Sequence, residues 1–157
     1  REYALKFDPA NSPNLLFMGN TGLGKTHLTL AVAAEIIDKG FIPVYGAAEN
    51  LFSLIEKEKF SGENRSAYDA MIKSDLLIID DLGAEMATAF TKSALYNLIN
   101  TRLLSGRPTI INTNLTMKEI EARYTARISS RLIGNFEAYK FIGADIRQQK
   151  ALEKIGK

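Results

Sequence analysis

The feature that most constrains the fold of this 157-residue chain is a glycine-rich segment, residues 19–26, between an apolar run and a helical pattern. The apolar run occupies residues 14–18, and the segment after it follows the pattern G-x-x-x-x-G-K-[ST] in full. Beyond the segment, Leu28, Val32 and Ile36 recur at the i, i+4 spacing of one helix face. A buried strand, a tight turn and a helix in this order predict the opening of a βαβ unit.

The rest of the chain alternates between expected strands and expected helices. Residues 76–79 form a second apolar run without polar alternation, which is typical of a parallel strand covered on both faces. Pro43 predicts that the strand expected at residues 41–45 lies at a sheet edge, because proline donates no ladder hydrogen bond. Further strands are expected at residues 109–113 and 139–142, and further helices at residues 49–73 (two, divided at 61–64), at 91–105, from the capping box of Thr116 and Glu119, and at 127–132.

These elements predict an α/β fold, namely a three-layer P-loop nucleotide-binding domain with a mostly parallel, five-stranded sheet. With 46% apolar residues the chain can bury the core of one domain, so we assign residues 1–157 to a single domain. The chain begins with Arg1 rather than Met, and we expect it to be a fragment of a longer protein.

Composition excludes several classes of protein. The chain has no cysteine and one histidine, His27, which excludes disulfides, thiolate zinc sites and His-rich metal sites. No apolar run reaches the ~18 residues that a membrane-spanning helix needs, and the N-terminus lacks a secretory pattern. We therefore expect a soluble, cytoplasmic protein with no membrane partner.

The net charge of +2 is spread unevenly along the chain. Residues 1–85 hold 8 Lys and Arg against 13 Asp and Glu, whereas residues 86–157 hold 12 against 5. A basic half suits contact with nucleic acid or with a neighbouring subunit's nucleotide, and ordinary solvated charge is the alternative.

The glycine-rich segment predicts a binding site for the phosphates of a nucleoside triphosphate with Mg²⁺. Glycines let the loop curl so that successive backbone N–H groups point at one phosphate, and the positive end of the following helix dipole adds to this field. Lys25 is expected to reach the β- and γ-phosphates, and the Thr26 hydroxyl to bind Mg²⁺. The residues expected to contact the nucleotide are Gly19, Asn20, Thr21, Gly22, Leu23, Gly24, Lys25, Thr26 and His27.

Two carboxylates follow the second apolar run. Asp80 is placed to hold Mg²⁺ through water, as the partner that Thr26 requires, and Asp81, one residue beyond the expected strand end, is the candidate that polarises the attacking water. Glu85 is a rival or an assistant for this base role, because loops bend and its reach is similar.

Three classes of P-loop enzyme carry a phosphate-binding loop of this kind. Residues 80–83 fit the D-x-x-G of GTPases, but no guanine-reading N-K-x-D follows, which favours ATP. A small-molecule kinase would need an arginine-bearing lid, and none is evident. An oligomeric ATPase explains more: Asn114 follows a strand where it can meet the γ-phosphate or the water, and Arg127 and Arg131 share a helix face that could supply an arginine finger in trans.

Three ordered motifs, residues 76–83, 113–115 and 130–132, resemble the bacterial and phage replicative helicase loaders of the DnaC/DnaI type, AAA+ ATPases whose close relative is the transposition ATPase IstB. The resemblance covers roughly residues 13–147. It implies an AAA+ core without a C-terminal lid domain, with Asp80 and Asp81 as Walker B, Asn114 as sensor 1 and Arg131 as the arginine finger. Asp81 stands where many relatives carry Glu, and its shorter arm implies slow hydrolysis.

The same resemblance implies an ATP-dependent homo-oligomer that engages single-stranded DNA and a replicative helicase. We expect that the loaders' N-terminal helicase-binding domain is missing from this sequence. The two helices expected at residues 49–73 resemble an insertion associated with single-stranded DNA, and Arg147 either replaces a lid arginine or is a plain surface charge. Basic residues that could meet DNA phosphates, or form a solvated face, are Lys57, Lys59, Arg65 and Lys73.

Two alternatives in function stay open at this point. The same ATPase core could deliver a transposase instead of a helicase, as in IstB-like proteins. A monomeric nucleotide-handling P-loop enzyme acting on a small substrate is the other alternative.

Overall fold

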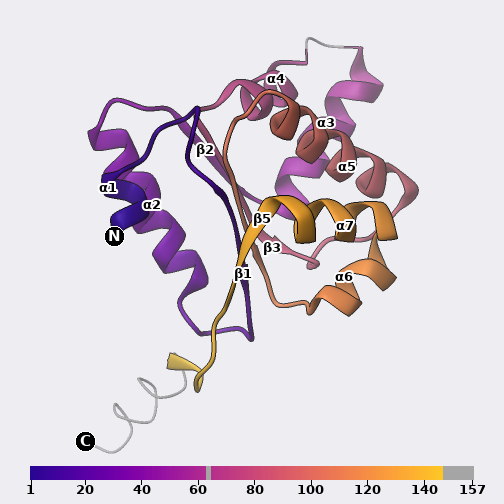
Figure 1. The fold of residues 1–157 in the computed structure, drawn as a ribbon. Helices are drawn as coiled ribbons and strands as arrows, with labels where there is room; N and C mark the ends of the chain where they lie inside the picture. Colours follow the sequence, from indigo (N-terminus) through magenta and orange to yellow (C-terminus); the bar gives the residue numbers. More distant parts are fainter. Residues whose placement is uncertain (63–64, 147–157) are drawn as a thin grey trace, which may run out of the picture.

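The computed structural model describes residues 1–62 and 65–146 and shows a sheet with helices on both faces (Figure 1). The described strands are β1 (Asn14–Met18), β2 (Pro43–Ala47), β3 (Leu76–Leu82), β4 (Thr109–Thr113) and β5 (Phe136–Lys140). The described helices are α1 (Glu2–Leu5), α2 (Lys25–Asp38), α3 (Ala48–Ser61), α4 (Ser66–Lys73), α5 (Ala89–Leu104), α6 (Met117–Arg123) and α7 (Ala126–Asn135).

All four strand pairings are parallel, and the strand order is β2-β3-β4-β1-β5. The predicted α/β class and five-stranded sheet are therefore confirmed, with a fully parallel sheet in place of a mostly parallel one. Because β3 and β4 lie between β1 and β2, the carboxyl ends of β1, β3 and β4 meet at one edge of the sheet. In open α/β sheets ligands bind at this edge.

The apolar run of β3 is buried on both sides, as its lack of alternation predicts. Leu76 and Ile78 join one apolar cluster, which lies under α1 and α2, while Leu77 and Ile79 join the other, under α3 to α7 (Figure 1). All four side chains are 0% exposed. Successive side chains of a strand point to opposite faces, so one short run anchors both helical layers.

Several predicted bounds were wrong by a few residues. β2 begins at Pro43 rather than residue 41, and β5 spans Phe136–Lys140 rather than 139–142. Both are edge strands, as Pro43 predicts for β2. An edge strand has a neighbouring strand on one side only, so its residues are less buried and its apolar pattern in the sequence is weaker. Leu28, expected on the buried face of α2, is 38% exposed, and the single turn α1 was not predicted.

The capping box is confirmed at the start of α6, where the Thr116 and Glu119 side chains each accept from the other's backbone N–H. No helix among residues 1–62 and 65–146 is long and apolar enough to cross a membrane.

A buried arginine joins three segments beneath the helical layer formed by α3 to α7. Arg102 of α5 is 1% exposed and donates to the carbonyl oxygens of Met71 at 2.6 Å, Ser74 at 3.1 Å and Pro108 at 2.6 Å, and to Thr109 Oγ1 at 3.0 Å. Burial, more than any nearby charge, lowers the pKa of Arg102 to about 10. The guanidinium thus satisfies the carbonyl groups that precede β3 and β4, because each would otherwise be buried without a donor.

Replacing Arg102 with Met is expected to lower the free energy of unfolding by ~3–5 kcal/mol, because it leaves several buried acceptors without a donor. Urea unfolding followed by circular dichroism measures this loss. The control is Arg107→Met: the Arg107 side chain is 35% exposed and meets Asp75 at 3.4 Å, so the loss is expected to stay below ~1 kcal/mol. Equal losses in the two variants would show that Arg102 does not carry the predicted load.

Candidate nucleotide-binding site

The glycine-rich loop lies between β1 and α2, in the strand–turn–helix setting that a phosphate-binding loop requires. Gly22 and Gly24 have φ angles of 76° and 87°, a left-handed conformation that glycine adopts without steric cost, and Gly24 is the N-cap of α2. The free backbone N–H groups of the first turn of α2 therefore point toward the loop.

Lys25 ties this loop to the end of β4. Its ammonium group donates to the carbonyl oxygens of Gly19 at 2.6 Å and Asn20 at 2.8 Å, and to Asn114 Oδ1 at 2.8 Å. The residue is 6% exposed, and burial lowers the pKa of Lys25 while the charges of Asp81 and Asp80 oppose that shift. All three donors of the ammonium group are occupied, so a phosphate that bound to Lys25 would have to replace at least one of these oxygens.

Thr26 meets Asp80, the carboxylate that the sequence analysis pairs with it. The Thr26 hydroxyl lies 3.1 Å from Asp80 Oδ1 and 3.0 Å from Oδ2. Asp80 is 5% exposed and also accepts from the Tyr45 hydroxyl at 2.7 Å and from Asn112 Nδ2 at 2.7 Å. Sequence reasoning missed Tyr45 and Asn112, since only the pairing of β2, β3 and β4 brings them to Asp80.

The donors around Thr26 fit Mg²⁺. A hydroxyl and a carboxylate are the hard oxygen ligands that this ion prefers, and Mg²⁺ usually keeps several waters and takes its other ligands from phosphates. The described residues contain no group of three His, Cys, Asp or Glu side chains that could hold a metal by themselves.

Asp81 lies on an irregularity of β3 rather than beyond its end. The strand continues to Leu82, and its register against β4 shifts between Ile79 and Leu82. Asp81 has a φ angle of 51°, and in the described part of the chain it is the one non-glycine residue with a positive φ. The residue is exposed. Its Oδ1 accepts a long hydrogen bond of 3.4 Å from Asn114 Nδ2. A bulge of this kind redirects a side chain, here from the sheet toward the loop.

Glu85 occupies a different place. It is 3% exposed and accepts from the Tyr124 hydroxyl and, at 2.9 Å, from the backbone N–H of Gly83, while Arg123 donates to its carbonyl oxygen. Burial, followed by the bond to Glu85, raises the pKa of Tyr124. The Glu85 carboxylate is thus held between the β3–α5 loop and α6, away from the residues that line the phosphate pocket.

A pocket of about 370 Å³ opens over the loop. The Lys25 and Asn114 contacts also place Gly19 and Asn20 beside this pocket. The structure therefore brings together most residues that the sequence nominated for the nucleotide, His27 included. The pocket is lined by Thr21, Gly22, Leu23, Gly24, Lys25, Thr26, His27, Asp81, Asn114 and Ile146.

The chain returns to the loop after β5. The backbone N–H of Ile146 donates to Gly22 O at 3.0 Å, and a Cβ placed on Gly22 would lie 2.0 Å from Asp145 Oδ1. Gly22 is therefore needed for this close approach as well as for its φ angle. Arg147, the candidate lid arginine, lies outside the described residues.

The two candidate finger arginines lie apart from the pocket. Arg127 and Arg131 are exposed on α7, where they line a separate hollow with Tyr96, and the Arg131 guanidinium is 5.9 Å from the Tyr96 ring centroid. The sequence prediction that they share a helix face is consistent with this common hollow. Neither residue contributes to the nucleotide pocket of its own chain.

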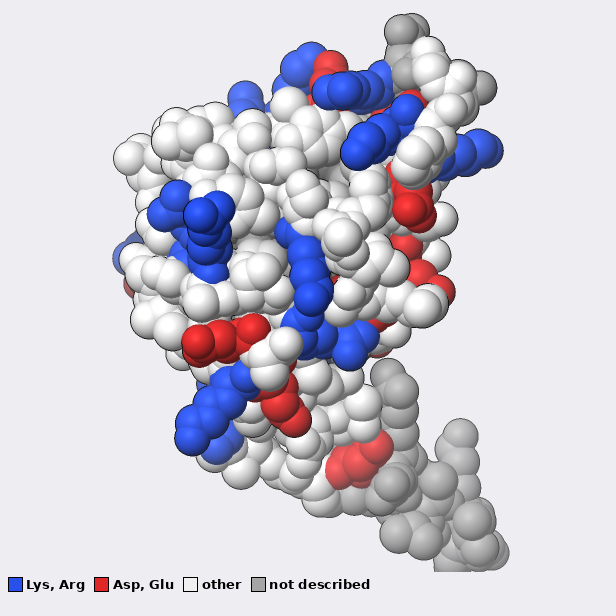
Figure 2. Space-filling model, turned by 90° about the vertical axis from the view of Figure 1, so that its right-hand side faces the viewer, with Lys and Arg blue, Asp and Glu red and all other residues white. Residues whose placement is uncertain are grey.

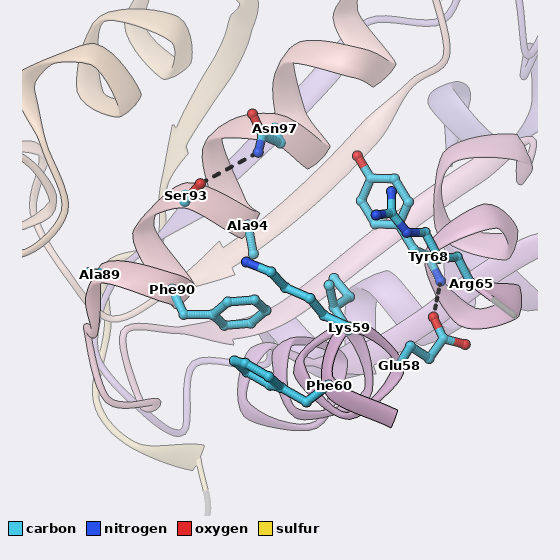
Figure 3. A pocket seen from close by; sticks show the side chains of 11 residues that line it. Glu58, Lys59, Phe60, Arg65, Tyr68, Ala89, Phe90, Ser93, Ala94 and Asn97 are labelled. Carbon is cyan, nitrogen blue, oxygen red and sulfur yellow. Dashed lines mark hydrogen bonds between the residues drawn. The ribbon is translucent and has the colours of Figure 1, made fainter. Parts of the chain in front are cut away.

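A pocket of about 520 Å³ lies between α3, α4 and α5 (Figure 3). The Lys59 ammonium lies 5.2 Å from the Phe90 ring centroid and 5.9 Å from that of Phe60, which is 74% exposed. Arg65 lines the pocket beside Tyr68, as Figure 3 shows.

The other basic candidates of α3 and α4 do not line this pocket. Lys57 is exposed, and Lys73 forms a surface ion pair with Asp69 at 2.9 Å. Figure 2 shows further Lys and Arg groups over the face that carries the larger helical layer, interspersed with acidic groups. This face is therefore mixed in charge, with a basic and aromatic pocket at one place on it.

Comparison with known proteins gives a family and a fold. The family model described as "IstB-like ATP binding protein" matches residues 4–150. The replicative helicase loader DnaC of Escherichia coli (strain K12) is 28% identical over 138 residues, which cover 86% of this chain and 56% of that protein. The insertion sequence IS5376 putative ATP-binding protein of Geobacillus stearothermophilus is 27% identical over 106 residues, 68% of this chain and 42% of that protein.

Among solved structures, the crystal structure of the DnaC helicase loader superposes with a TM-score of 0.84 at 23% sequence identity and covers 90% of this chain and 85% of that one. The fold is therefore that of a P-loop AAA+ domain, as predicted. The chain spans about half the length of the curated relatives it matches.

The backbone of Asp81 generates a prediction about stability. Asp81→Gly is expected to raise the free energy of unfolding by about 1 kcal/mol, because glycine adopts the left-handed conformation without steric cost. Asp81→Ala is the control, since it removes the same carboxylate without relieving the backbone, and no gain is expected. Urea unfolding of both variants decides the matter. An equal change in both would attribute the effect to the carboxylate instead.

Proposed function

This chain belongs to the family of IstB-like ATP binding proteins, and we propose that it binds ATP with Mg²⁺, hydrolyses it slowly and acts as an oligomer that helps place a replicative helicase on single-stranded DNA. The observation that carries the proposal is the convergence of the β1, β3 and β4 ends. Lys25, Thr26, Asp80, Asp81 and Asn114 all lie within hydrogen-bond reach of another member of the set.

In the proposed reaction the loop holds the nucleotide. Lys25 exchanges its bond to Asn114 for the β- and γ-phosphates, and the N-terminal N–H groups of α2 add the positive end of the helix dipole. Thr26 and, through water, Asp80 would hold Mg²⁺, and the bound ion would supply positive charge to stabilise the transferred phosphoryl group. The nucleobase of the bound nucleotide is taken to be adenine, because the chain lacks a guanine-reading motif and its family is described as ATP-binding.

Asp81 is the proposed base that polarises the attacking water. Its carboxylate is exposed at the pocket and next to Asn114, whose amide is freed to orient the water once Lys25 turns to phosphate. Glu85, the rival, is bound by Tyr124 and Gly83 and is assigned a structural role instead. Asp is one methylene shorter than Glu, and this shorter reach supports slow hydrolysis.

Arg131 is the proposed arginine finger, supplied to the nucleotide of a neighbouring subunit. Its exposure on α7, apart from the pocket of its own chain, supports a role in trans. Each active site would then be divided between two copies, so that ATP binding and oligomer assembly are coupled.

DNA contact is proposed for the pocket between α3, α4 and α5. Single strands bind to surfaces that combine cations for the phosphates with aromatic rings for the bases, and Lys59, Arg65, Phe60 and Phe90 supply both kinds of group. Contact with the helicase is proposed by analogy with the longer loaders and is assigned to no residue here.

Delivery of a transposase is the second candidate. The family description and the similarity to the insertion-sequence protein of Geobacillus stearothermophilus favour it. The ATPase site and the DNA contacts would be the same, and only the protein partner would differ. Binding assays with a helicase and with a transposase therefore separate the two candidates.

Complementation between variants tests the divided site. Lys25→Ala and Arg131→Ala are each expected to lose ATP turnover, because each removes one half of every site. In an equal mixture, one interface in four pairs an intact Lys25 with an intact Arg131, so about a quarter of the original turnover is expected from random assembly. Phosphate release measures it.

Arg127→Ala is the matched control, because Arg127 lies on the same face of α7 and is expected to leave turnover unchanged. If Arg131→Ala alone hydrolyses ATP normally, or if both variants are inactive and their mixture recovers no turnover, the divided site is wrong.

DNA binding is tested with the pocket residues. Lys59→Ala is expected to weaken binding of an oligo-dT strand several-fold and to reduce the slope of log affinity against log salt by ~0.7, the loss of one single-strand phosphate contact. Fluorescence anisotropy over a salt series measures both. Lys6→Ala, on an exposed residue of the opposite helical layer, is the control with no expected change. Identical slopes for the two variants would remove the pocket from the proposed DNA path.

A further inference from the structure

Asp80 is held by more groups than the two motifs account for. Its Oδ1 accepts from Asn112 Nδ2 at 2.7 Å and its Oδ2 from the Tyr45 hydroxyl at 2.7 Å, and the Thr26 hydroxyl lies between both oxygens. These donors come from β4, β2 and α2. The carboxylate plane is thus defined from both sides before any nucleotide binds.

The Tyr45 hydroxyl is not needed to bury the ring. Tyr45 lies on the edge strand β2 and is 42% exposed, so water could satisfy its hydroxyl at little cost. The hydroxyl instead donates to Asp80 Oδ2 at 2.7 Å. A phenylalanine would fill the same place in the sheet but would leave Oδ2 without this donor.

Asn112 has the opposite setting but the same partner. It is 0% exposed, and its Nδ2 also donates to Thr29 Oγ1 at 3.1 Å, while its Oδ1 accepts no hydrogen bond from the described part of the chain. A buried acceptor without a donor costs stability. An apolar residue would avoid this cost in a central strand, so the amide is explained by what its donors hold, namely Asp80 and Thr29.

We propose that Tyr45 and Asn112 are positioning residues of the nucleotide site, which fix the Asp80 carboxylate so that it faces Thr26 and the magnesium–phosphate position. The proposal rests on the proposed function, because it assigns Asp80 to the ion that accompanies ATP. Groups that orient a metal-holding side chain change metal affinity by ~10–100-fold when they are removed. The effect belongs to Mg²⁺-dependent binding and not to the nucleotide contacts of the loop.

The test is a Mg²⁺ titration of nucleotide binding. A fluorescent ATP analogue is held at a fixed trace concentration, and the Mg²⁺ concentration at half-maximal binding is measured. Tyr45→Phe is expected to raise that concentration about tenfold, while affinity in excess EDTA and the midpoint of urea unfolding stay unchanged. Asn112→Val is expected to shift the Mg²⁺ dependence in the same direction.

Tyr139→Phe is the matched control. Tyr139 lies on the other edge strand, β5, and its hydroxyl donates to Glu137 at 2.9 Å, so no shift is expected. An unchanged Mg²⁺ dependence in Tyr45→Phe overturns the positioning role, and so does an equal loss of affinity in EDTA, which would mark a general structural defect. If the unaltered protein binds no ATP analogue with Mg²⁺, the proposed function itself fails and the positioning role falls with it.

Discussion

The complete burial of Leu76 to Ile79, the apolar part of β3 between two parallel neighbours, is the constraint on which the rest of the structure depends. Leu76 to Ile79 supply apolar side chains to both helical layers, so the strand cannot shift its register without exposing one of them. Because β3 pairs with β2 on one side and β4 on the other, its carboxyl end is delivered to the same edge as the loop after β1. Asp80 and Asp81, at that end of β3, therefore lie beside the loop.

The two adjacent acids have different surroundings at this edge. Asp80 continues the strand and lies buried among donors from three elements, whereas Asp81 sits on the bulge with a positive φ and is exposed. A regular strand would point Asp81 to the opposite face from Asp80, and the bulge turns it toward Asn114 instead. A rigidly held acid, proposed to hold the ion, and an accessible base candidate thus arise from neighbouring residues by backbone geometry.

Several features that lower the stability of the fold also lie at this edge of the sheet. The left-handed backbone of Asp81 and the unpaired Oδ1 of Asn112 each cost stability, and Lys25 is drawn into a buried place between carbonyl groups. Local departures of this kind concentrate at functional sites, where the surrounding structure maintains them. Arg102 shows the contrasting case, since its buried donors are matched by carbonyl groups and its role is to hold the helical layer formed by α3 to α7 to the sheet.

Much of the chemistry could be predicted from the sequence, because it resides in local patterns. The residues 19–26, the apolar run before Asp80 and the capping box at Thr116 each depend on a few neighbours in the chain, and the order of strands and helices follows from their periodicity. The predicted bounds of the edge strands were wrong by a few residues, because a largely exposed strand such as β5 has few apolar residues to mark it in the sequence.

The tertiary structure alone decided which side chains meet. Along the chain Glu85 is a rival to Asp81 for the role of base. In the structure the Glu85 carboxylate accepts from Tyr124, at the end of α6, whereas the bulge presents Asp81 to the pocket. Tyr45 and Asn112 carry no motif, and they reach Asp80 only because β2 and β4 flank β3. The sequence by itself determined that a phosphate loop and two acids exist, since these are local patterns. The parallel strand pairing decided what holds those acids, because contacts between distant segments depend on register and not on proximity in the chain.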